Sequence, residues 1–213
     1  MKELLIRTER EEDYRAVEQM TRDAFWNIYI PGCVEHYLVH SMRGHADFIS
    51  ELALVAEVKG QIVANIMYTK AKLIDEQQVE KEILTFGPLC VHPAYQRQGI
   101  GKQLMAYSFD KALEMGLDVV VIFGNPGNYV SSGFKSCKKY NVCMEDDVFP
   151  SAMLVRELRP DCLDGRRWYY HDSPVFAVDE AEALKYDAQF EEKEKKYQHS
   201  QEEFYIHSHS VIR

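Results

Sequence analysis

The first part of the chain alternates between short apolar runs and segments with helical spacing. Leu4–Arg7 is an apolar run that predicts a first strand. From about Asp13, apolar residues recur at i, i+3 and i+4, which predicts a helix that ends at Pro31-Gly32. A second helix is predicted from Val34 to Met42. The chain therefore opens with one strand and two helices.

The next part predicts strands. Leu52–Val58 and Gln61–Tyr68 are apolar runs joined by Lys59-Gly60, a pattern typical of a β-hairpin. Ile83–Val91 is a further run of nearly continuous apolar character, which suits a strand covered on both faces.

A helical period returns after this strand. Gly99–Met115 has the spacing of an amphipathic helix, Leu117–Phe123 predicts a buried strand, and a short helix is predicted from Pro126 to Gly133. Ser151–Leu158 is predicted as the last strand of the core. This alternation of strands and helices favours an α/β fold with a mixed central sheet and helices on both faces.

The segment after residue 158 differs in composition. It carries an aromatic cluster, Trp168–Tyr170, and then a highly charged stretch from Asp179 to Gln201. Within that stretch, Glu191–Lys196 predicts a solvated helix with i, i+4 ion pairs. We therefore expect a core domain at residues 1–158 and a charged helical C-terminal extension at 159–213 that packs on it.

Charge and cysteine content narrow the class of protein. The 213 residues carry a formal net charge of -9, which argues against a nucleic-acid partner because such a protein needs a basic face. The five cysteines are irregularly spaced, and no apolar stretch has the length of a signal sequence or a membrane span. We expect a cytoplasmic protein with reduced thiols and no membrane association. His36 and His40 have a metal-binding spacing but lack the other residues of a metal motif, so no metal site is predicted.

The stretch Gln96–Lys102 predicts an anion-binding turn. It lies between a strand that Pro93 ends and an amphipathic helix, and its two glycines let the backbone approach a phosphate at the helix N-terminus. A P-loop is excluded because Gln96 stands where its first glycine belongs, and a Rossmann fingerprint because Leu104 stands where its third belongs.

Two motifs in the right order resemble the GNAT superfamily of N-acetyltransferases. The first is Q/R-x-x-G-x-G/A at Gln96–Gly101, and the second is Y-x-x-x-G-F at Tyr129–Phe134. The resemblance covers roughly Leu4–Leu158. It implies a GNAT-like mixed sheet flanked by helices and acetyl-CoA as co-substrate.

The resemblance also implies where acetyl-CoA binds. Its pantetheine arm is expected between the strand that ends at Val91 and the strand at 118–123, with a bulge at Gly87-Pro88 that opens the sheet. Tyr129 is implied as the general acid that protonates the leaving thiolate. Cys90 is interpreted as a small buried hydrophobe and not as a nucleophile. The implied cofactor-binding residues are Leu89, Cys90, Val91, Gln96, Arg97, Gln98, Gly99, Ile100, Gly101, Lys102, Asn125 and Tyr129.

The general base is left open. Many family members carry a carboxylate in the strand that ends at Val91, where this chain has Thr85, Phe86 and Gly87. A relay through water, or an acceptor that is already neutral, would remove the need for such a base. The remaining candidates are Glu35, Glu51, Tyr68 and His92.

The residues that form the wall of the acceptor pocket are also left undecided. Phe25, Trp26 and Tyr29 lie where the family builds one wall of the acceptor pocket, although we interpret them first as core residues. Trp168–Tyr170 either caps that pocket or holds the tail in place.

The favoured function is direct transfer of an acetyl group from acetyl-CoA to a primary amine of a small molecule or peptide. The acceptor itself is not identified by the sequence, and a homodimer is compatible with the resemblance at the level of the fold. A non-catalytic acyl-CoA sensor or interaction module on the same fold is the alternative, and a nucleotide-phosphate binder that uses the Gly99 turn is a more distant one.

Overall fold

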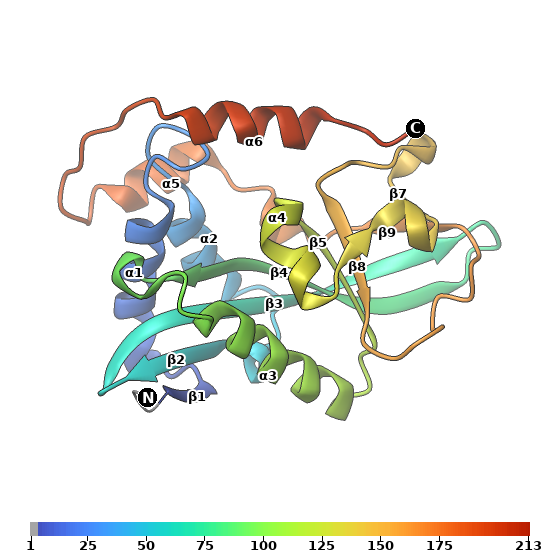
Figure 1. Cartoon of the computed structure of the whole chain (residues 1–213). Coiled ribbons are helices and arrows are strands. Elements are labelled where there is room, and N and C mark those ends of the chain that lie inside the picture. The colour runs from blue at the N-terminus through green and yellow to red at the C-terminus, as the bar shows by residue number, and fades with distance from the viewer. Residues whose placement is uncertain (1–3) are drawn as a thin grey trace.

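The computed structural model describes residues 4–213. Within these residues nine strands form one sheet with helices on both faces (Figure 1). The strands follow the order β1-β2-β3-β4-β5-β8-β6, and β9 pairs with both β3 and β7. Pairing is antiparallel except between β4 and β5 and between β7 and β9. The mixed sheet flanked by helices confirms the predicted fold class.

The element bounds agree with most of the sequence predictions. The strands are β1 (Leu4–Thr8), β2 (Leu54–Val58), β3 (Gln61–Asp75), β4 (Glu80–Val91), β5 (Val119–Phe123), β6 (Lys135–Ser136), β7 (Val142–Cys143), β8 (Met153–Glu157) and β9 (Trp168–His171). The helices are α1 (Tyr14–Phe25), α2 (Glu35–Met42), α3 (Ile100–Glu114), α4 (Pro126–Tyr129), α5 (Glu180–Asp187) and α6 (His199–His209).

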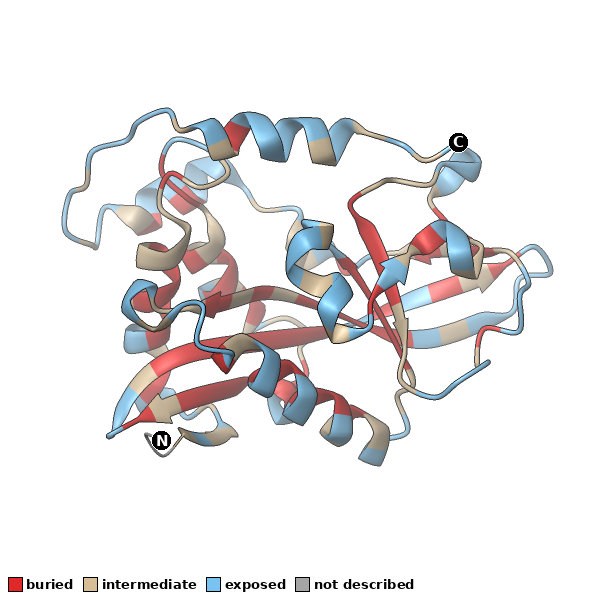
Figure 2. Ribbon diagram, viewed as in Figure 1, coloured by how far each residue is buried: buried red, intermediate tan, exposed pale blue. Residues whose placement is uncertain are grey.

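Successive strand residues point to opposite faces of the sheet, and both faces are covered by helices. Leu54 and Ile66 pack with α3 on one face. Their neighbours Val55 and Met67 pack with α1 and α2 on the other. Figure 2 shows the resulting buried layer along the central strands, with exposed residues on the outer sides of the helices.

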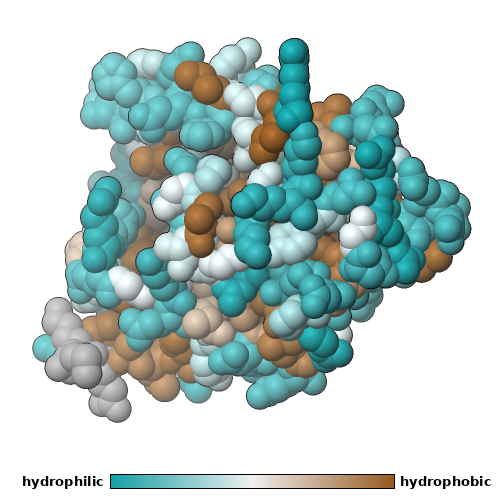
Figure 3. Space-filling model, turned by 45° about the vertical axis from the view of Figure 1, so that its right-hand side comes forward, coloured by the Kyte–Doolittle hydropathy of each residue, from teal (hydrophilic) through white to brown (hydrophobic). Residues whose placement is uncertain are grey.

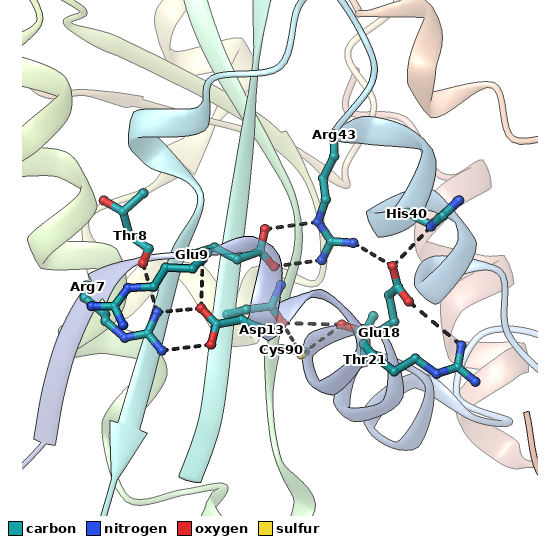
Figure 4. A network of polar contacts seen from close by, with 12 residues as sticks. Arg7, Thr8, Glu9, Asp13, Glu18, Thr21, His40, Arg43 and Cys90 are labelled. Atoms are coloured by element: carbon teal, nitrogen blue, oxygen red, sulfur yellow. Dashed lines mark hydrogen bonds and ion pairs between the residues drawn. The ribbon is translucent and has the colours of Figure 1, made fainter. Parts of the chain in front are cut away.

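Helices α1 and α2 are held together by a buried ion network (Figure 4). The guanidinium of Arg43 binds the carboxylate of Glu9 at 2.7 Å and that of Glu18 at 2.6 Å. Glu18 also accepts a hydrogen bond at 2.7 Å from the hydroxyl of Tyr186 in α5. The network thereby connects the N-terminal helices to the C-terminal extension.

Strands β3 and β4 are each longer than predicted and form a hairpin, since β3 continues to Asp75 and β4 already starts at Glu80. The ammonium of Lys72 binds the carboxylate of Glu80 diagonally across the hairpin at 2.7 Å. Asp75 closes the turn by accepting two backbone hydrogen bonds at 2.8 Å, from Gln77 and Val79. The additional strand residues are rich in charged side chains, so a prediction based on apolar runs does not detect them.

Two predictions for the C-terminal part were wrong. Residues 191–198 form no helix, because their backbone is used in contacts with the α1–α2 loop: the carbonyl of Glu194 accepts hydrogen bonds at 3.0 Å from Trp26 and from Asn27. The helical parts of the extension are α5 and α6 instead. The strand predicted at Ser151–Leu158 is not the last one, since β9 follows and pairs with β3.

The surface is mostly hydrophilic on the face drawn in Figure 3, where apolar residues lie in separate patches. Large exposed apolar side chains include Phe204, Tyr205 and Ile206 of α6. None of the described helices is both long and apolar enough to cross a bilayer.

Candidate active site

Strands β4 and β5 separate at the centre of the sheet. Their only registered pair is Leu84 with Val120, and beyond Leu84 strand β4 continues with β3 alone. A register shift in the β3–β4 ladder coincides with Gly87-Pro88, which confirms the predicted bulge. A Cβ atom on Gly87 would lie 3.3 Å from the ring of Phe176, so glycine also allows the close approach of that side chain.

The opened edge of β4 presents peptide groups to the gap. The N–H of His92 donates to the carbonyl of Val63 at 2.8 Å, so the N–H of Val91 and, two residues earlier, that of Leu89 point to the opposite edge. The peptide group of Cys90 points to β3, its ladder partner. The backbone peptide groups of Leu89 and Val91 can therefore form hydrogen bonds with an extended ligand that lies in the gap like an added strand.

A glycine turn leads from β4 into α3. Gly99 is the N-cap of α3 with φ of 81°, a left-handed conformation that favours glycine. The first helical hydrogen bond runs from Gln103 N–H to the carbonyl of Gly99 at 3.1 Å, which leaves the N–H groups of residues 100–102 at a positive helix end. Arg97 and Lys102 are exposed beside this turn. These groups suit a pyrophosphate.

A cavity of about 680 Å³ joins the glycine turn to the opened edge of β4. Its lining includes nine residues that were predicted to bind the cofactor: Leu89, Val91, Gln96, Arg97, Gly99, Ile100, Gly101, Lys102 and Tyr129. Tyr95, Met105, Gly127, Asn128 and Ser131 also line it and were not predicted.

The other three predicted cofactor residues lie outside that lining. The thiol of Cys90 points away from the cavity and donates to Asn65 at 2.7 Å, and burial raises its pKa to about 12. The side chain of Gln98 donates to the carbonyl of Ala94 at 3.2 Å. Asn125 caps α4 by accepting the N–H of Gly127 at 2.9 Å. Cys90 is thus a buried thiol, and Gln98 and Asn125 shape the two turns.

Tyr129 ends α4 and lies against the aromatic core. Its ring centroid is 5.8 Å from those of Phe86 and Phe134. A Cβ atom on Gly124 would lie 2.6 Å from the Tyr129 ring, so Gly124 is needed for this placement, and the sequence analysis missed it. Burial, and secondarily the nearby Tyr29, raise the pKa of the Tyr129 hydroxyl, which keeps it protonated at neutral pH.

A second cavity, of about 360 Å³, meets the first at Tyr129. Leu89, Asn128 and Tyr129 line both cavities. Phe25 and Tyr29, interpreted from the sequence as core residues, are half-buried and line the second cavity. Phe123, Asp172 and Phe176 also line it, and the sequence analysis did not single them out. Only the folded chain brings residues of such distant segments together.

The α1–α2 loop that carries Tyr29 is held by the C-terminal extension. The side-chain oxygen of Asn27 accepts hydrogen bonds from Gly32 N–H at 2.8 Å and from Lys196 N–H at 3.1 Å. The ring of Tyr29 packs at 4.5 Å on Phe204 of α6. Trp168–Tyr170, in contrast, forms β9 and lies outside the lining of both cavities.

The four candidate bases are placed very differently. Glu35 lines the second cavity. Glu51 is exposed beside Ser50, and Tyr68 is fully buried, with its hydroxyl 2.7 Å from that of Ser108. The Nδ1 of His92 accepts the N–H of Ala94 at 3.2 Å, and the residue lines neither cavity. Among these four, Glu35 alone faces the space next to Tyr129.

Comparisons with known proteins agree with this geometry. Residues 50–136 match the model of the acetyltransferase (GNAT) domain. The uncharacterized N-acetyltransferase YhbS of Escherichia coli K12 is 28% identical over 163 residues, which cover 76% of this chain and 92% of YhbS. The crystal structure of Escherichia coli YhbS in complex with CoA has a TM-score of 0.72 and 24% identity, covering 84% of this chain and 94% of that one. A GNAT family acetyltransferase from Brucella melitensis in complex with acetyl-CoA has a TM-score of 0.64 and 24% identity, covering 83% and 99%.

Residues 50–136 thus match a GNAT-type acetyltransferase domain, and this range contains the point where β4 and β5 separate and the glycine turn. Over most of its length the chain is similar to N-acetyltransferases of the GNAT superfamily, whose co-substrate is acetyl-CoA.

Proposed function

We propose that this chain is an acetyl-CoA-dependent N-acetyltransferase that moves the acetyl group directly to a primary amine. The observation that supports this most strongly is the junction of two cavities at Leu89, Asn128 and Tyr129. One cavity has phosphate-binding features at its far end, and the other, which lacks them, is lined mainly by aromatic side chains. Such a pair suits two substrates that meet at one point.

The residues of the first cavity fit acetyl-CoA. The N-terminus of α3 with Arg97 and Lys102 would hold the pyrophosphate, and the peptide groups of Leu89 and Val91 would bind the pantetheine amides. Bound acetyl-CoA supplies an acetyl group activated as a thioester. Tyr129 holds a proton next to the site where the thiol leaves, and the N–H of Val91 is a donor for charge that develops on the acetyl oxygen.

The experiment that tests this function is thermal unfolding with and without acetyl-CoA, for the wild type and for Gly101→Glu. At about 100 times Kd, binding to the native state alone adds about 2.7 kcal/mol to the free energy of unfolding. We expect a rise in Tm for the wild type and none for Gly101→Glu, because Gly101 lines the cavity at the helix N-terminus. Ala106→Glu adds the same charge to an exposed position of α3 outside the cavity, and it should keep the shift. A wild type without any shift would contradict the proposal.

The division into a core at residues 1–158 and an extension at 159–213 is a second proposal. The three apolar core clusters include Leu163, Trp168 and Tyr170 but no described residue after Val178, so the part of the extension that lies outside the core begins after Val178. The contacts of residues 194–204 with the α1–α2 loop indicate that the extension shapes the acceptor side of the site.

A further inference from the structure

The second cavity has a lining that restricts what it can accept. Six aromatic side chains surround it: Phe25, Tyr29, Phe86, Phe123, Tyr129 and Phe176. A volume of about 360 Å³ is at the small end of ligand sites, so it suits a small molecule or one side chain. Aromatic faces bind flat apolar groups and also attract cations.

The charges in this cavity have one sign. Glu35 and Asp172 are the only charged side chains in its lining, and both are acids. Asp172 is exposed at the rim, where its Oδ1 accepts the hydroxyl of Tyr170 at 2.9 Å and the N–H of Ser173 at 2.8 Å. A carboxylate or phosphate on the acceptor would find no cationic side chain in this lining. A cationic amine on an apolar body meets complementary groups throughout.

Glu35 is the acid that lies deeper in the site. It stands at the first position of α2, where one carboxylate oxygen accepts the N–H of Val34 at 3.0 Å. Among the described residues no lysine, arginine or histidine forms an ion pair with it. Its carboxylate is therefore available to a cation that enters the cavity.

We propose that the second cavity takes an arylalkylamine-like acceptor, a primary amine on a flat apolar body without an acidic group, and that Glu35 receives its ammonium group and removes a proton. This inference rests on the proposed acetyltransferase function and names its substrate class and its base.

The proton and electron balance is simple. Glu35 takes one proton from the ammonium, the freed lone pair forms the N–C bond to the acetyl carbon, and the C–S bond breaks with its electrons on sulfur. Tyr129 protonates that sulfur and regains a proton from the new amide nitrogen. Glu35 releases its proton to water, so the products are the N-acetylated amine, free thiol and one proton.

Titration of Glu35 fits this role. Burial raises its pKa to about 7. The groups that face it are Tyr29 and Cys33 from the preceding loop, Tyr129 from α4 and Asp172 after β9, and none of them is a cation. A base acts in its deprotonated form, so kcat/KM should fall as the pH drops below about 7.

The test compares phenethylamine with phenylalanine, which differs by one carboxylate, and with butylamine, which lacks the ring. Thiol release and mass spectrometry of the product report transfer, and calorimetry with CoA present reports acceptor binding. We expect kcat/KM for phenethylamine to exceed that for phenylalanine on the order of a hundredfold or more, since an unpaired like charge is strongly disfavoured. Butylamine should bind more weakly than phenethylamine because it leaves the aromatic lining unfilled.

Variants test the base. Glu35→Gln keeps the shape and should lower kcat on the order of 10²- to 10⁴-fold and abolish the acidic limb of the pH profile. Glu51→Gln, a matched change at an exposed position outside both cavities, should leave rate and profile unchanged.

The outcomes separate the two proposals. If acetyl-CoA fails to raise the Tm, the acetyltransferase function fails and this inference falls with it. If acetyl-CoA binds but phenethylamine neither binds nor is acetylated, or phenylalanine is used equally well, the acceptor class is wrong while the function stands. A Glu35→Gln variant with full rate and an unchanged acidic limb would overturn the role of Glu35.

Discussion

At the scale of residues, Tyr129 occupies the point where the two cavities meet. It lines both cavities, and burial holds its hydroxyl in the protonated form. Its position depends on Gly124, where any side chain would collide with the ring, and on Gly133, whose φ of 89° ends the short helical segment. The Y-x-x-x-G-F motif therefore specifies the backbone conformation around Tyr129 as well as the tyrosine itself.

Replacing the hydroxyl of Tyr129 should separate chemistry from binding. We expect Tyr129→Phe to lower kcat about 10²- to 10⁴-fold, because the leaving sulfur loses its proton donor, while the ring still packs on Phe86. Steady-state kinetics measures the rate, and the acetyl-CoA-induced rise in Tm measures binding, which should persist. Tyr107→Phe on the exposed side of α3 is the control. Full activity of Tyr129→Phe would remove this residue from the mechanism.

At the scale of elements, the placement of α2 decides where Glu35 points. Arg43 follows α2 directly and binds Glu9 and Glu18, all three with side chains at most 7% exposed. Removing one partner of a buried ion network leaves the other charges without compensation. The network around Arg43 thus anchors one end of α2, and Glu35, the acid of the proposed acceptor site, lies at the other end.

Arg43→Met should accordingly destabilise the protein by about 3–5 kcal/mol, as expected when one partner of a buried pair is lost. Arg10→Met is the matched control: Arg10 pairs with Glu12 on the surface, where such a pair contributes about 1 kcal/mol or less. Urea unfolding of the two variants beside the wild type measures both values. Equal losses for the two substitutions would show that the network around Arg43 does not stabilise the fold.

An element could be predicted when the residues that determine it are neighbours in the sequence, and not when they are distant. The glycine turn before α3 and the Asn125-Pro126 start of α4 are local signals, and the structure has both. The helix predicted at Glu191–Lys196 is not formed, because hydrogen bonds with Asn27, which is distant in sequence, outweigh the local charge pattern. The same limit applies to the acceptor side, where Glu35, Phe123 and Phe176 meet only in the folded chain.

At the scale of the whole molecule, α6 spans the top of the structure from the α1–α2 loop towards β7 (Figure 1). At its start the hydroxyl of Ser200 donates to the carbonyl of Ile28 at 2.8 Å, and the Gln201 amide donates to the carbonyl of Asn27 at 3.0 Å. After its end, the N–H of Ile212 donates to the carbonyl of Phe149 at 2.8 Å. The helix is fixed at both ends while its apolar side chains stay largely exposed.

Deleting residues 199–213 should leave a folded protein that still binds acetyl-CoA but has a higher KM for the amine. The core clusters contain none of these residues, whereas the loop with Tyr29 loses its contacts to Ser200, Gln201 and Phe204. Thermal shift with acetyl-CoA and the KM of phenethylamine measure the two effects. Phe204→Ala in the full chain should raise the KM in the same direction by a smaller factor. An unchanged KM in the deletion variant would separate α6 from the acceptor site.

The dependence of the α1–α2 loop on residues 194–204 has a consequence during synthesis. On the ribosome, the strands and helices that form the acetyl-CoA cavity emerge long before the segment that braces the loop. A nascent chain can therefore complete the cavity proposed for acetyl-CoA while the cavity proposed for the amine is still unsupported. Selectivity for the proposed amine would then be acquired later in synthesis than the binding of acetyl-CoA.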